Sequence, residues 1–305
     1  MKTLIIGNVY VDVIINVDSL PKTNDDILCK KQVISMGGCA YNVATILNNF
    51  GVEHDLISPV GKGIYASLIE RELIENNYKI HIKEEEEDNG YCLCLVEEDG
   101  ERTFITIKGI EYKYKMDWLD KIDSCDYENI YISGYEMEGH NGRIISRWLE
   151  NQKNKKLFFG PGPRINFIEK DTLNKIFKLN PILHLNEEEA IKFTNEKDIL
   201  NAARYLNNIT DNTVFITLGE NGVLYFNKDS YKFIDAVKTK VVNTIGAGDS
   251  HIGAIISSHS LGYEFEECCY IANKVSSKVV NSDKSRLEKD MFNKNEYILD
   301  NKVIV

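Results

Sequence analysis

Short apolar runs alternate with helical patterns along most of the chain. Six runs predict β-strands over Leu4 to Ile6, His54 to Val60, Asn129 to Ser133, Lys156 to Phe159, Ile182 to Leu185 and Thr213 to Leu218. Between them, apolar residues recur at helical spacing over Ile64 to Asn77, Gly142 to Asn151, Glu187 to Thr194 and Ile199 to Asn208. Strands that alternate with helices are typical of a parallel sheet with helical crossovers. We therefore predict an α/β fold with a doubly wound, mostly parallel sheet flanked by helices.

Two pairs of segments break this alternation, because their apolar residues recur at every second position. The pairs are Val11 to Val17 with Ile27 to Ile34, and Tyr91 to Val96 with Thr103 to Lys108. This pattern suits a sheet with one exposed face, and Asp99-Gly100 favours a hairpin turn. We predict a single domain over residues 1–305 with a small β-sheet lid formed by about residues 9–35 and 90–110. Because the apolar face of such a lid must be covered, we expect a homodimer through the lids.

The last third of the chain predicts helices over Ala247 to Leu261 and Phe265 to Val280, and a weaker one over Arg286 to Phe292. The tail from Tyr297 to Val305 has the composition of a terminal strand. The acidic run from Glu84 to Asp88 is typical of a solvated loop rather than of a metal site.

The composition is that of an ordinary globular protein, with 43% hydrophobic and 27% charged residues. Its formal net charge of −11 opposes binding to nucleic acid or to an anionic membrane, since both require a basic surface. The seven cysteines are odd in number and include no Cys-x-x-Cys pair, as expected for free thiols in a reducing compartment. The first apolar run stops at Gly7, far short of a signal peptide or a membrane span. We expect a cytoplasmic protein.

Candidate chemistry is concentrated in residues 241–250, Val-Val-Asn-Thr-Ile-Gly-Ala-Gly-Asp-Ser, which lead into an apolar helix. Gly246 and Gly248 around Ala247 leave backbone N–H groups uncovered at the start of that helix, where an anion is favoured. Asp249 is held ionised by the same dipole, so it can accept a proton although it is a weak base. Phosphoryl transfer tolerates a weak base, because it depends mainly on positioning and charge stabilisation. Alternatively, this segment only caps a helix.

At this point the chain resembles the ribokinase-like, or PfkB, family of carbohydrate and nucleoside kinases, whose second signature reads roughly Asp-Thr-x-Gly-Ala-Gly-Asp. Four further segments are similar to family motifs and follow the family's order: Gly7-Asn8-x-x-x-Asp12, Gly37-Gly38-Cys39-Ala40-Tyr41-Asn42, Asn186-x-x-Glu189 and Thr217-Leu218-Gly219-Glu220-Asn221-Gly222. The resemblance implies an ATP-dependent carbohydrate kinase, which moves the γ-phosphate of ATP to a hydroxyl of a sugar or sugar derivative.

The same resemblance implies roles for the residues that match the motifs. Asp249 would be the catalytic base, and the loop of Gly246, Ala247 and Gly248 would form the anion hole. Glu189 would act on the ATP phosphates through Mg²⁺ and its waters, since carboxylate oxygens suit this metal. The residues that would hold the nucleotide are Asn186, Thr217, Gly219, Gly222 and Asn273, the last at the edge of the adenine slot. The alternative on the residues alone is that Glu189 is an ordinary solvent-facing glutamate of a helix, and that Gly219 and Gly222 belong to a surface turn.

On the acceptor side, Asp12, Gly38 and Asn42 would contact the substrate. A carboxylate and an amide suit vicinal hydroxyls, because each can accept hydrogen bonds from a diol. Arg102 and Arg164 are the cations expected near an anionic group, and both are equally well explained as surface arginines. The lid would close over the acceptor and exclude water.

Three positions depart from the family's patterns. Asn243 stands where an Asp usually opens the second signature and helps to bind a monovalent cation in many relatives, so potassium dependence is not implied. His251 stands where an apolar residue is common, and we expect a packed or lid-facing side chain rather than a second base. Residues 61–66, Gly-Lys-Gly-Ile-Tyr-Ala, depart from Gly-x-Asp-x-x-Gly at Gly63 and Ala66, which leaves one substrate contact unassigned.

Other functions fit parts of the sequence. The glycine spacing from Gly61 to Ala66 fits a dinucleotide fingerprint of an NAD-binding enzyme, although it comes late in the chain. A kinase fold that binds ligand without turnover is a third class, which ATP consumption with any polyol would separate. Within the family, a nucleoside kinase of the adenosine or pseudouridine type is the alternative. The short two-part lid and the compact length favour a sugar.

Overall fold

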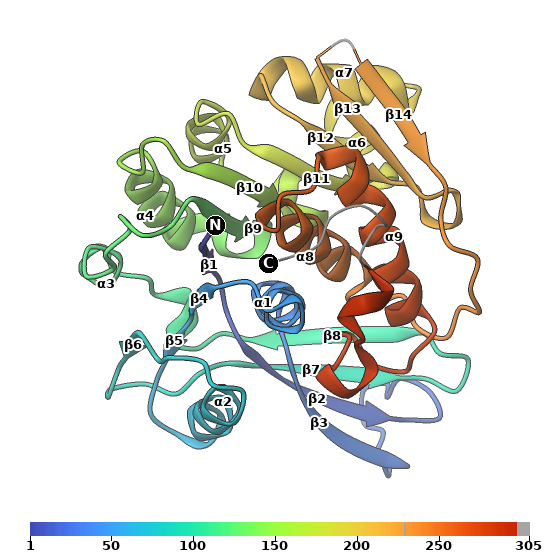
Figure 1. Cartoon of the computed structure of the whole chain (residues 1–305). Coiled ribbons are helices and arrows are strands. Elements are labelled where there is room, and N and C mark those ends of the chain that lie inside the picture. Colours follow the sequence, from blue (N-terminus) through green and yellow to red (C-terminus); the bar gives the residue numbers. More distant parts are fainter. Residues whose placement is uncertain (229, 298–305) are drawn as a thin grey trace. The chain divides into compact units, whose positions relative to one another are not determined.

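A mostly parallel sheet of eight strands organises the larger of the two units into which the chain divides (Figure 1). The strand order is β14 (Ser230–Ile234), β13 (Val223–Asn227), β12 (Val214–Thr217), β11 (Ile182–Asn186), β10 (Lys156–Gly160), β9 (Asn129–Ser133), β1 (Thr3–Ile6) and β4 (His54–Ile57). Strands β1, β9, β10, β11 and β12 pair in parallel, whereas β13 and β14 are added antiparallel at one edge. The predicted α/β fold is confirmed.

The structure is a computed structural model that describes residues 1–228 and 230–297. Its larger unit comprises Met1–Gly7, Cys39–Leu56 and the described residues from Lys115 onward, and its smaller unit comprises Asn8–Gly38 and Ile57–Tyr114. Most of the tail for which a terminal strand was predicted, residues 298–305, lies outside the described residues.

Helices cover the central sheet. They are α1 (Cys39–Phe50), α3 (Met116–Leu119), α4 (Gly139–Leu149), α5 (Lys170–Phe177), α6 (Glu187–Thr194), α7 (Ile199–Thr210), α8 (Ala247–Ser260) and α9 (Phe265–Val280). Short 3-10 turns are η2 (Gly134–Met137), η3 (Gly162–Phe167), η4 (Gly219–Asn221), η5 (Lys289–Met291) and η6 (Lys294–Glu296). Helix α8 packs closely on α1, because a Cβ on Gly253 would lie 3.0 Å from Cβ of Ile46. None of the described helices has both the length and the hydropathy needed to span a membrane.

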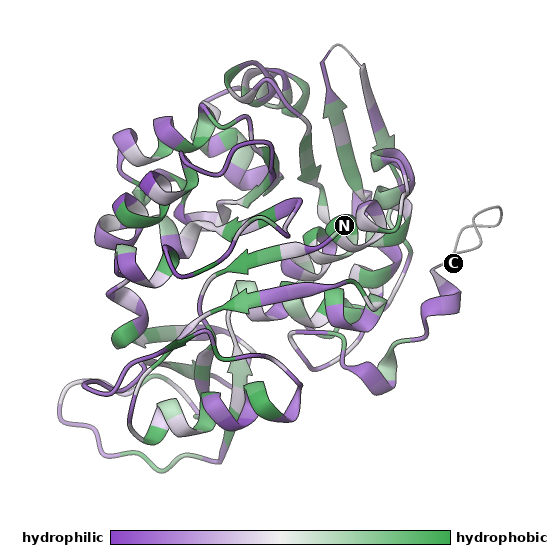
Figure 2. Cartoon of the chain, turned by 60° about the vertical axis from the view of Figure 1, so that its left-hand side comes forward, coloured by the Kyte–Doolittle hydropathy of each residue, from purple (hydrophilic) through white to green (hydrophobic). Residues whose placement is uncertain are grey.

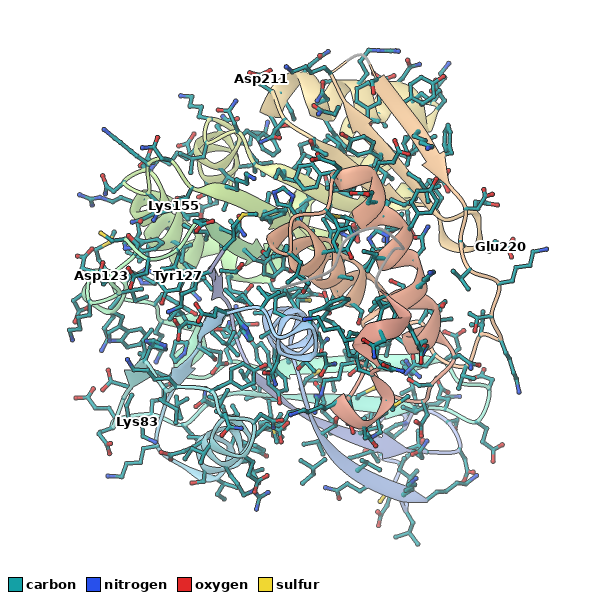
Figure 3. The ribbon with its side chains drawn as sticks, viewed as in Figure 1. Lys83, Asp123, Tyr127, Lys155, Asp211 and Glu220 are labelled. Carbon is teal, nitrogen blue, oxygen red and sulfur yellow. The ribbon has the colours of Figure 1, made fainter. Side chains whose placement is uncertain are left out.

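The core of the larger unit lies on both faces of the sheet, where the strands are largely apolar (Figure 2). Leu4, Phe158 and Phe215 on three of these strands are fully buried. Burial of one such side chain contributes about 1.5–3 kcal/mol to the free energy of unfolding. At the amino-terminal edge of the sheet, Nζ of Lys155 donates to the carbonyl oxygen of Tyr127 at 2.5 Å (Figure 3). Apolar strands buried on both faces are what the sequence pattern requires of a parallel sheet.

The smaller unit contains a four-stranded sheet in the order β3 (Lys31–Gly37), β2 (Tyr10–Asn16), β7 (Tyr91–Val96) and β8 (Arg102–Ile107). It also contains α2 (Ile64–Glu75), the paired β5 (Pro59–Val60) and β6 (Ile82–Lys83), and η1 (Ile110–Tyr112). Strands β7 and β8 form the predicted hairpin, in which the N–H of Gly100 donates to the carbonyl oxygen of Glu97 at 3.0 Å. That this separate sheet acts as a lid stays a prediction.

Several predicted boundaries were wrong. The run from Ile27 to Ile34 becomes a strand only from Lys31, since residues 27–30 are exposed and lie outside the sheet. The run from His54 to Val60 divides at Ser58 into β4 and β5, which belong to different units. The hairpin of β13 and β14 was not predicted. Instead of a helix over 286–292, only the short turn η5 forms, and Phe292 packs against the ring of Phe50, with centroids 4.8 Å apart.

The departure from the family pattern at Gly63 has a structural counterpart in Asp88. A Cβ on Gly63 would lie 2.2 Å from Oδ2 of Asp88, so the carboxylate of Asp88 occupies the space of a side chain at position 63. Its Oδ1 accepts from the N–H of Ala66 at 2.7 Å, and its Oδ2 accepts from the N–H of Tyr65 at 3.3 Å. Asp88 thus caps the first turn of α2, and the acidic run is not merely a solvated loop.

This exchange predicts a compensating pair of substitutions. Asp88→Gly should lower the free energy of unfolding by about 1 kcal/mol, the usual worth of a lost cap. Gly63→Asp alone should also destabilise, because two carboxylates would then compete for one place. The double variant should recover only part of the loss, since a carboxylate again faces the start of α2 but residue 63 keeps φ +158° and ψ −162°, a backbone that strains any side chain. Urea unfolding of the four proteins measures the coupling, and purely additive losses would contradict the exchange.

Candidate active site

Predicted site residues of the larger unit follow the carboxyl ends of neighbouring parallel strands. Asn186 is the last residue of β11, Thr217 ends β12, and Arg164 follows β10 in η3. In open α/β sheets, ligands bind outside this edge. The edge therefore collects motif residues that are far apart in the sequence.

Asp249 and Asn42 meet where α8 and α1 begin. Nδ2 of Asn42 donates to Oδ2 of Asp249 at 2.9 Å. The Asn42 side chain is buried, and its Oδ1 has no hydrogen-bond partner among the described residues. A buried carbonyl oxygen without a partner lowers the stability of the fold unless a ligand hydroxyl donates a hydrogen bond to it. The pair therefore presents side by side a carboxylate and an amide oxygen without a hydrogen-bond partner in the described part of the chain.

The electrostatics around Asp249 favour proton acceptance. Burial raises the pKa of Asp249 above its ordinary value, whereas hydrogen bonds from Asn42 and Cys39 lower it. Burial also raises the pKa of the Cys39 thiol well above its usual range, and the charge of Asp249 adds to that effect. Asp249 is therefore a stronger base than the helix dipole alone suggested, and Cys39 remains a neutral thiol.

The predicted anion-hole loop has the backbone that its glycines permit. Gly246 has φ +74°, and a Cβ there would lie 1.7 Å from the carbonyl oxygen of Ser285, so only glycine fits. A Cβ on Gly248 would meet nothing within 4 Å, which leaves that side of the helix start open. N–H groups in a first helical turn have no acceptor within the helix. The start of α8 can therefore donate hydrogen bonds to an anion.

Asn186 and Glu189 form a reciprocal cap on α6. Oδ1 of Asn186 accepts from the N–H of Glu189 at 2.8 Å, and Oε2 of Glu189 accepts from the N–H of Asn186 at 3.0 Å. Burial raises the pKa of Glu189, and the charges of Glu188 and Asp249 add to the rise. Among residues 1–228 and 230–297, no three His, Cys, Asp or Glu side chains cluster as a metal site. That Glu189 acts on Mg²⁺ through water stays a prediction.

The predicted nucleotide turn follows β12. The N–H of Leu218 donates to the carbonyl oxygen of Gly222 at 2.7 Å, which closes the turn. Gly219 has φ +58° and Gly222 has φ +89°, and a Cβ on Gly222 would lie 2.0 Å from the carbonyl oxygen of Ile234. Glu220 at the tip is exposed (Figure 3). The backbone favours glycine at 219 and requires it at 222, and the turn packs directly against residue 234.

Asn273 and His251 lie inside the larger unit. Nδ2 of Asn273 donates to the carbonyl oxygens of Ile234 and Asp235, at 3.1 and 2.9 Å. Both amide hydrogens of Asn273 are thus already engaged. The predicted contact of Asn273 with adenine stays a prediction. His251 is 2% exposed, which confirms the prediction of a packed side chain.

The remaining candidates differ in their surroundings. Arg164 forms an ion pair with Glu138, in which Nη2 donates to Oε2 at 2.9 Å, so its charge is compensated. In the smaller unit, Asp12 on β2 approaches Gly37 so closely that a Cβ there would lie 2.1 Å from its Oδ2. Gly38 has φ +107°, and Arg102 is exposed at the start of β8.

Comparison with known proteins gives the family. The model of the pfkB family carbohydrate kinases matches residues 2–289. The uncharacterized sugar kinase YegV of Escherichia coli is 33% identical over 283 residues, with 92% of this chain and 88% of YegV covered. The chain belongs to the pfkB family of carbohydrate kinases. A nucleoside kinase of Methanocaldococcus jannaschii is 27% identical over 285 residues, with 92% of this chain and 90% of that enzyme covered.

Solved structures of pfkB-type kinases have the same fold. A ribokinase from Thermotoga maritima superimposes with a TM-score of 0.82 at 20% identity, covering 97% of each chain. The M. jannaschii nucleoside kinase gives a TM-score of 0.78 at 22% identity, covering 97% of this chain and 96% of that chain. The predictions of a PfkB-type fold and of a carbohydrate kinase are confirmed, and kinases of this family use ATP and typically Mg²⁺.

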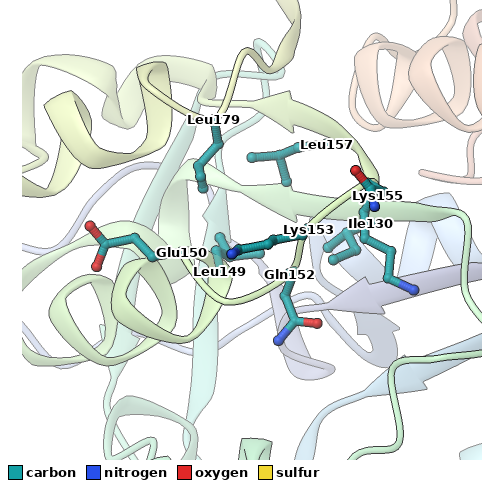
Figure 4. A pocket seen from close by; sticks show the side chains of 9 residues that line it. Ile130, Leu149, Glu150, Gln152, Lys153, Lys155, Leu157 and Leu179 are labelled. Carbon is teal, nitrogen blue, oxygen red and sulfur yellow. The ribbon is translucent and has the colours of Figure 1, made fainter.

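One pocket of this pfkB kinase lies away from the motif residues. It has a volume of about 290 Å³, and Leu149, Lys153 and Leu157 are among its lining residues (Figure 4). Leu157 stands near the amino end of β10, at the edge opposite to Asn186 and Thr217. We therefore assign this pocket no part in phosphoryl transfer.

Sequence reasoning missed Glu136, a buried carboxylate in η2 directly after β9. It is 3% exposed and accepts a hydrogen bond from the hydroxyl of Ser133. Its charge contributes, together with that of Asp249, to the raised pKa of Cys39, so Glu136 belongs to the same neighbourhood. An acidic residue three positions after a buried apolar strand was the signal that could have found it.

Asn243 does not fit a monovalent-cation site. Its Oδ1 accepts from the N–H of Ile245 at 3.0 Å, and its Nδ2 donates to the carbonyl oxygen of Asp283 at 3.3 Å. A neutral amide that points a donor at this carbonyl competes with a cation for the same oxygen. We derive no step through potassium.

Glu189→Gln should raise the Mg²⁺ concentration needed for half-maximal rate, because a negative charge near the metal's hydration shell is lost. Glutamine keeps the reciprocal cap, so the helix should remain intact. Glu187→Gln and Glu188→Gln are matched controls on the same turn and should behave like wild type. Magnesium titrations of the initial rate measure the effect, and equal shifts in all three variants would point to general surface charge instead.

Proposed function

We propose that this enzyme transfers the γ-phosphate of ATP to a hydroxyl of a sugar or sugar derivative, with Asp249 as the catalytic base. The observation that carries the proposal is the pair of Asn42 and Asp249 at the open start of α8. Their 2.9 Å hydrogen bond orients the carboxylate, and the unused Oδ1 of Asn42 can accept a hydrogen bond from the acceptor.

In the proposed reaction, the acceptor oxygen attacks the γ-phosphorus in line with the bridging oxygen. The new oxygen–phosphorus bond forms while the bond to that bridging oxygen breaks, and the bond electrons leave with ADP. Asp249 takes the hydroxyl proton, and the N–H groups at Gly246 and Gly248 donate to the oxygens of the transferred group. The N–H of Ala247 would join them after it leaves the carbonyl oxygen of Thr244, to which it donates at 3.3 Å. Bound Mg²⁺ supplies positive charge at the phosphates, and Asn186 and Glu189 would orient its waters.

The nucleotide side of the proposal rests on the turn after β12. Thr217 at the strand end and the backbone of Gly219 and Gly222 would bind the nucleotide, as in the motif that they match. On the acceptor side, Asp12, Gly38 and Asn42 would bind the diol. Arg102 and Arg164 remain candidates for an anionic substituent, although Arg164 would first have to exchange its partner Glu138.

A nucleoside acceptor is the second candidate, and one feature favours it. Arg164 lies over the ring of Phe167 at 4.4 Å and over that of Tyr135 at 5.8 Å, and these rings are 62% and 44% exposed. Burial raises the pKa of Tyr135 above its ordinary value, and the charge of Asp249 adds to the rise, which supports a place for this ring near Asp249. Exposed aromatic rings can stack on a planar base, whereas a free sugar gains less from them.

An ADP-release screen separates these candidates. Sugars, sugar phosphates, sugar acids and nucleosides are each tested as acceptors with wild type and with Asp249→Asn as the inactive control. Acceptor-dependent ADP release by wild type alone supports the proposal, and the preferred class decides between sugar and nucleoside. A rate that no acceptor raises above the ATPase background would reject it.

We further propose that the small sheet acts as a lid and pairs with that of a second copy. Strands β3 and β8, at its two edges, expose Ile34 at 50% and Phe104 at 56%. We expect light scattering at micromolar concentration to give a mass twice the chain mass of 34.9 kDa. Phe104→Glu should lower this measured mass toward that of one chain, because it places a charge on the exposed apolar edge. A monomeric mass for wild type would count against the dimer.

All seven cysteines are free, which supports a cytoplasmic location.

A further inference from the structure

Three buried polar side chains from three elements form one hydrogen-bonded row, the His–His–Asn row of His184, His251 and Asn273. They lie on β11, α8 and α9 and are 6%, 2% and 7% exposed. Nε2 of His184 lies 2.9 Å from Nδ1 of His251, and Nε2 of His251 lies 3.2 Å from Oδ1 of Asn273. The proposed transfer uses neither imidazole, so the row needs another explanation.

The end of the row at Asn273 fixes the direction of every hydrogen bond in it. Because Nδ2 of Asn273 donates to two backbone carbonyl oxygens, its Oδ1 must face His251. Nε2 of His251 therefore carries a proton, and Nδ1 of the same ring is an acceptor. Nε2 of His184 must then be the donor to that Nδ1. His251 is neutral and in one tautomer, because a second proton on its Nδ1 would place two N–H groups against each other. Burial lowers the pKa of His184 well below its usual range, so this ring is neutral as well.

One end of the row holds the backbone against which the nucleotide turn packs. Asn273 binds the carbonyl oxygens of Ile234 and Asp235. A Cβ on Gly222 would lie 2.0 Å from the first of these oxygens and 2.6 Å from the backbone nitrogen of Ala236. A shift of this backbone would therefore displace the turn that ends at Gly222.

The other members of the row stand beside residues of the proposed phosphate site. His251 comes two positions after Asp249 on α8, and His184 comes two positions before Asn186 on β11. Each histidine thus fixes the element that carries one of these groups. The row therefore joins α8 and β11 to the backbone against which the nucleotide turn packs.

We propose that His251 is a positioning residue for the nucleotide: through Asn273 it fixes the backbone at residues 234–236, and with it the turn that binds ATP. This inference rests on the proposed function for the identity of the ligand. It assigns His251 to nucleotide affinity rather than to proton transfer. A substitution there should weaken ATP binding and leave the acceptor side nearly unchanged.

The test is the affinity for a non-hydrolysable ATP analogue, measured by calorimetry without an acceptor. His251→Phe removes both hydrogen bonds of the ring, and we expect the dissociation constant to rise about 2- to 10-fold, the worth of a neutral hydrogen bond. His251→Gln can donate to Asn273 and accept from His184, so it should stay within about twofold of wild type. His251→Asn has the same groups on a shorter side chain and should behave like His251→Phe.

His259→Phe is the matched control, because it changes a histidine on the same helix that lies outside the row. In steady-state kinetics, His251→Phe and His251→Asn should raise the KM for ATP while the acceptor KM stays within about twofold. Wild-type affinity in both variants, or an equal loss in His259→Phe or His251→Gln, would overturn the inference. Failure of wild type to bind the analogue would reject the inference and the proposed function together, whereas binding without turnover would reject the function alone.

Discussion

Asp249→Asn should lower kcat by about 10²- to 10⁴-fold, the usual contribution of a positioned general base. The amide is nearly isosteric but cannot take the proton of the acceptor hydroxyl. Binding of ATP should change little, because the nucleotide turn lies on other elements. Single-turnover kinetics with the best acceptor, together with calorimetric ATP binding, measure both effects.

The pH dependence gives a second measure of the same group. Only the carboxylate form of Asp249 accepts a proton, so kcat/KM should fall as the pH drops through its pKa. The ordinary pKa of an aspartate is about 4. Because burial raises the pKa of Asp249, the acid limb of the profile should lie above that value. The hydrogen bond from Asn42 lowers the pKa, so Asn42→Leu should move the acid limb to higher pH.

Stability separates a lost base from a damaged fold. The raised pKa means that folding favours the protonated form of Asp249, so its contribution to stability is present at low pH and is lost as the pH rises through the folded-state pKa. At neutral pH the buried carboxylate is a cost that an amide does not have. Asp249→Asn should therefore unfold at the same temperature as wild type or higher. Turnover within a few-fold of wild type would remove Asp249 from the mechanism.

The sheet and the strand-end residues could be predicted because each depends on a local pattern. A buried parallel strand is a continuous apolar run, so Asn186 and Thr217, which stand at the ends of such runs, had to fall at the carboxyl edge. The hairpin of β13 and β14 was missed because its outer strand is mostly exposed and carries no long apolar run.

The pairings within the site could not be predicted, because they join distant residues. Asn42 and Asp249 are 207 positions apart, and nothing in either motif states that the amide faces the carboxylate. The exchange between Gly63 and Asp88 could not be predicted for the same reason. The sequence shows that position 63 lacks the aspartate of the family's pattern, but not that the carboxylate of Asp88 takes its place. His184 gave no signal at all, because a histidine in an apolar strand has the same appearance whether or not it has a buried partner.

Asp12→Ala should raise the acceptor KM about 10- to 150-fold if KM tracks affinity, because a charged hydrogen-bond acceptor is worth about 1.5–3 kcal/mol. Asp12 lies on β2, with Ser35 and Cys92 as its neighbours in register. Burial raises the pKa of Cys92 to about 11, and the charge of Asp12 adds to this effect. The carboxylate thus stands in a partly dry part of the small sheet, where hydrogen bonds to a ligand are strong.

The size and selectivity of the loss test this role of Asp12. The KM for ATP should move little, and Asn42→Ala should act in the same direction more weakly, because it removes a neutral hydrogen bond. Asp18→Ala is the matched control, since Asp18 is an exposed carboxylate of the same unit that pairs with Lys30. Deoxy analogues of the best acceptor, each lacking one hydroxyl, test which hydroxyl binds Asp12. Asp12→Ala should have the same KM for the complete acceptor and for the analogue that lacks this hydroxyl. If the variant penalises ATP and acceptor equally, or treats all deoxy analogues as wild type does, Asp12 acts instead as a structural residue that packs against Gly37.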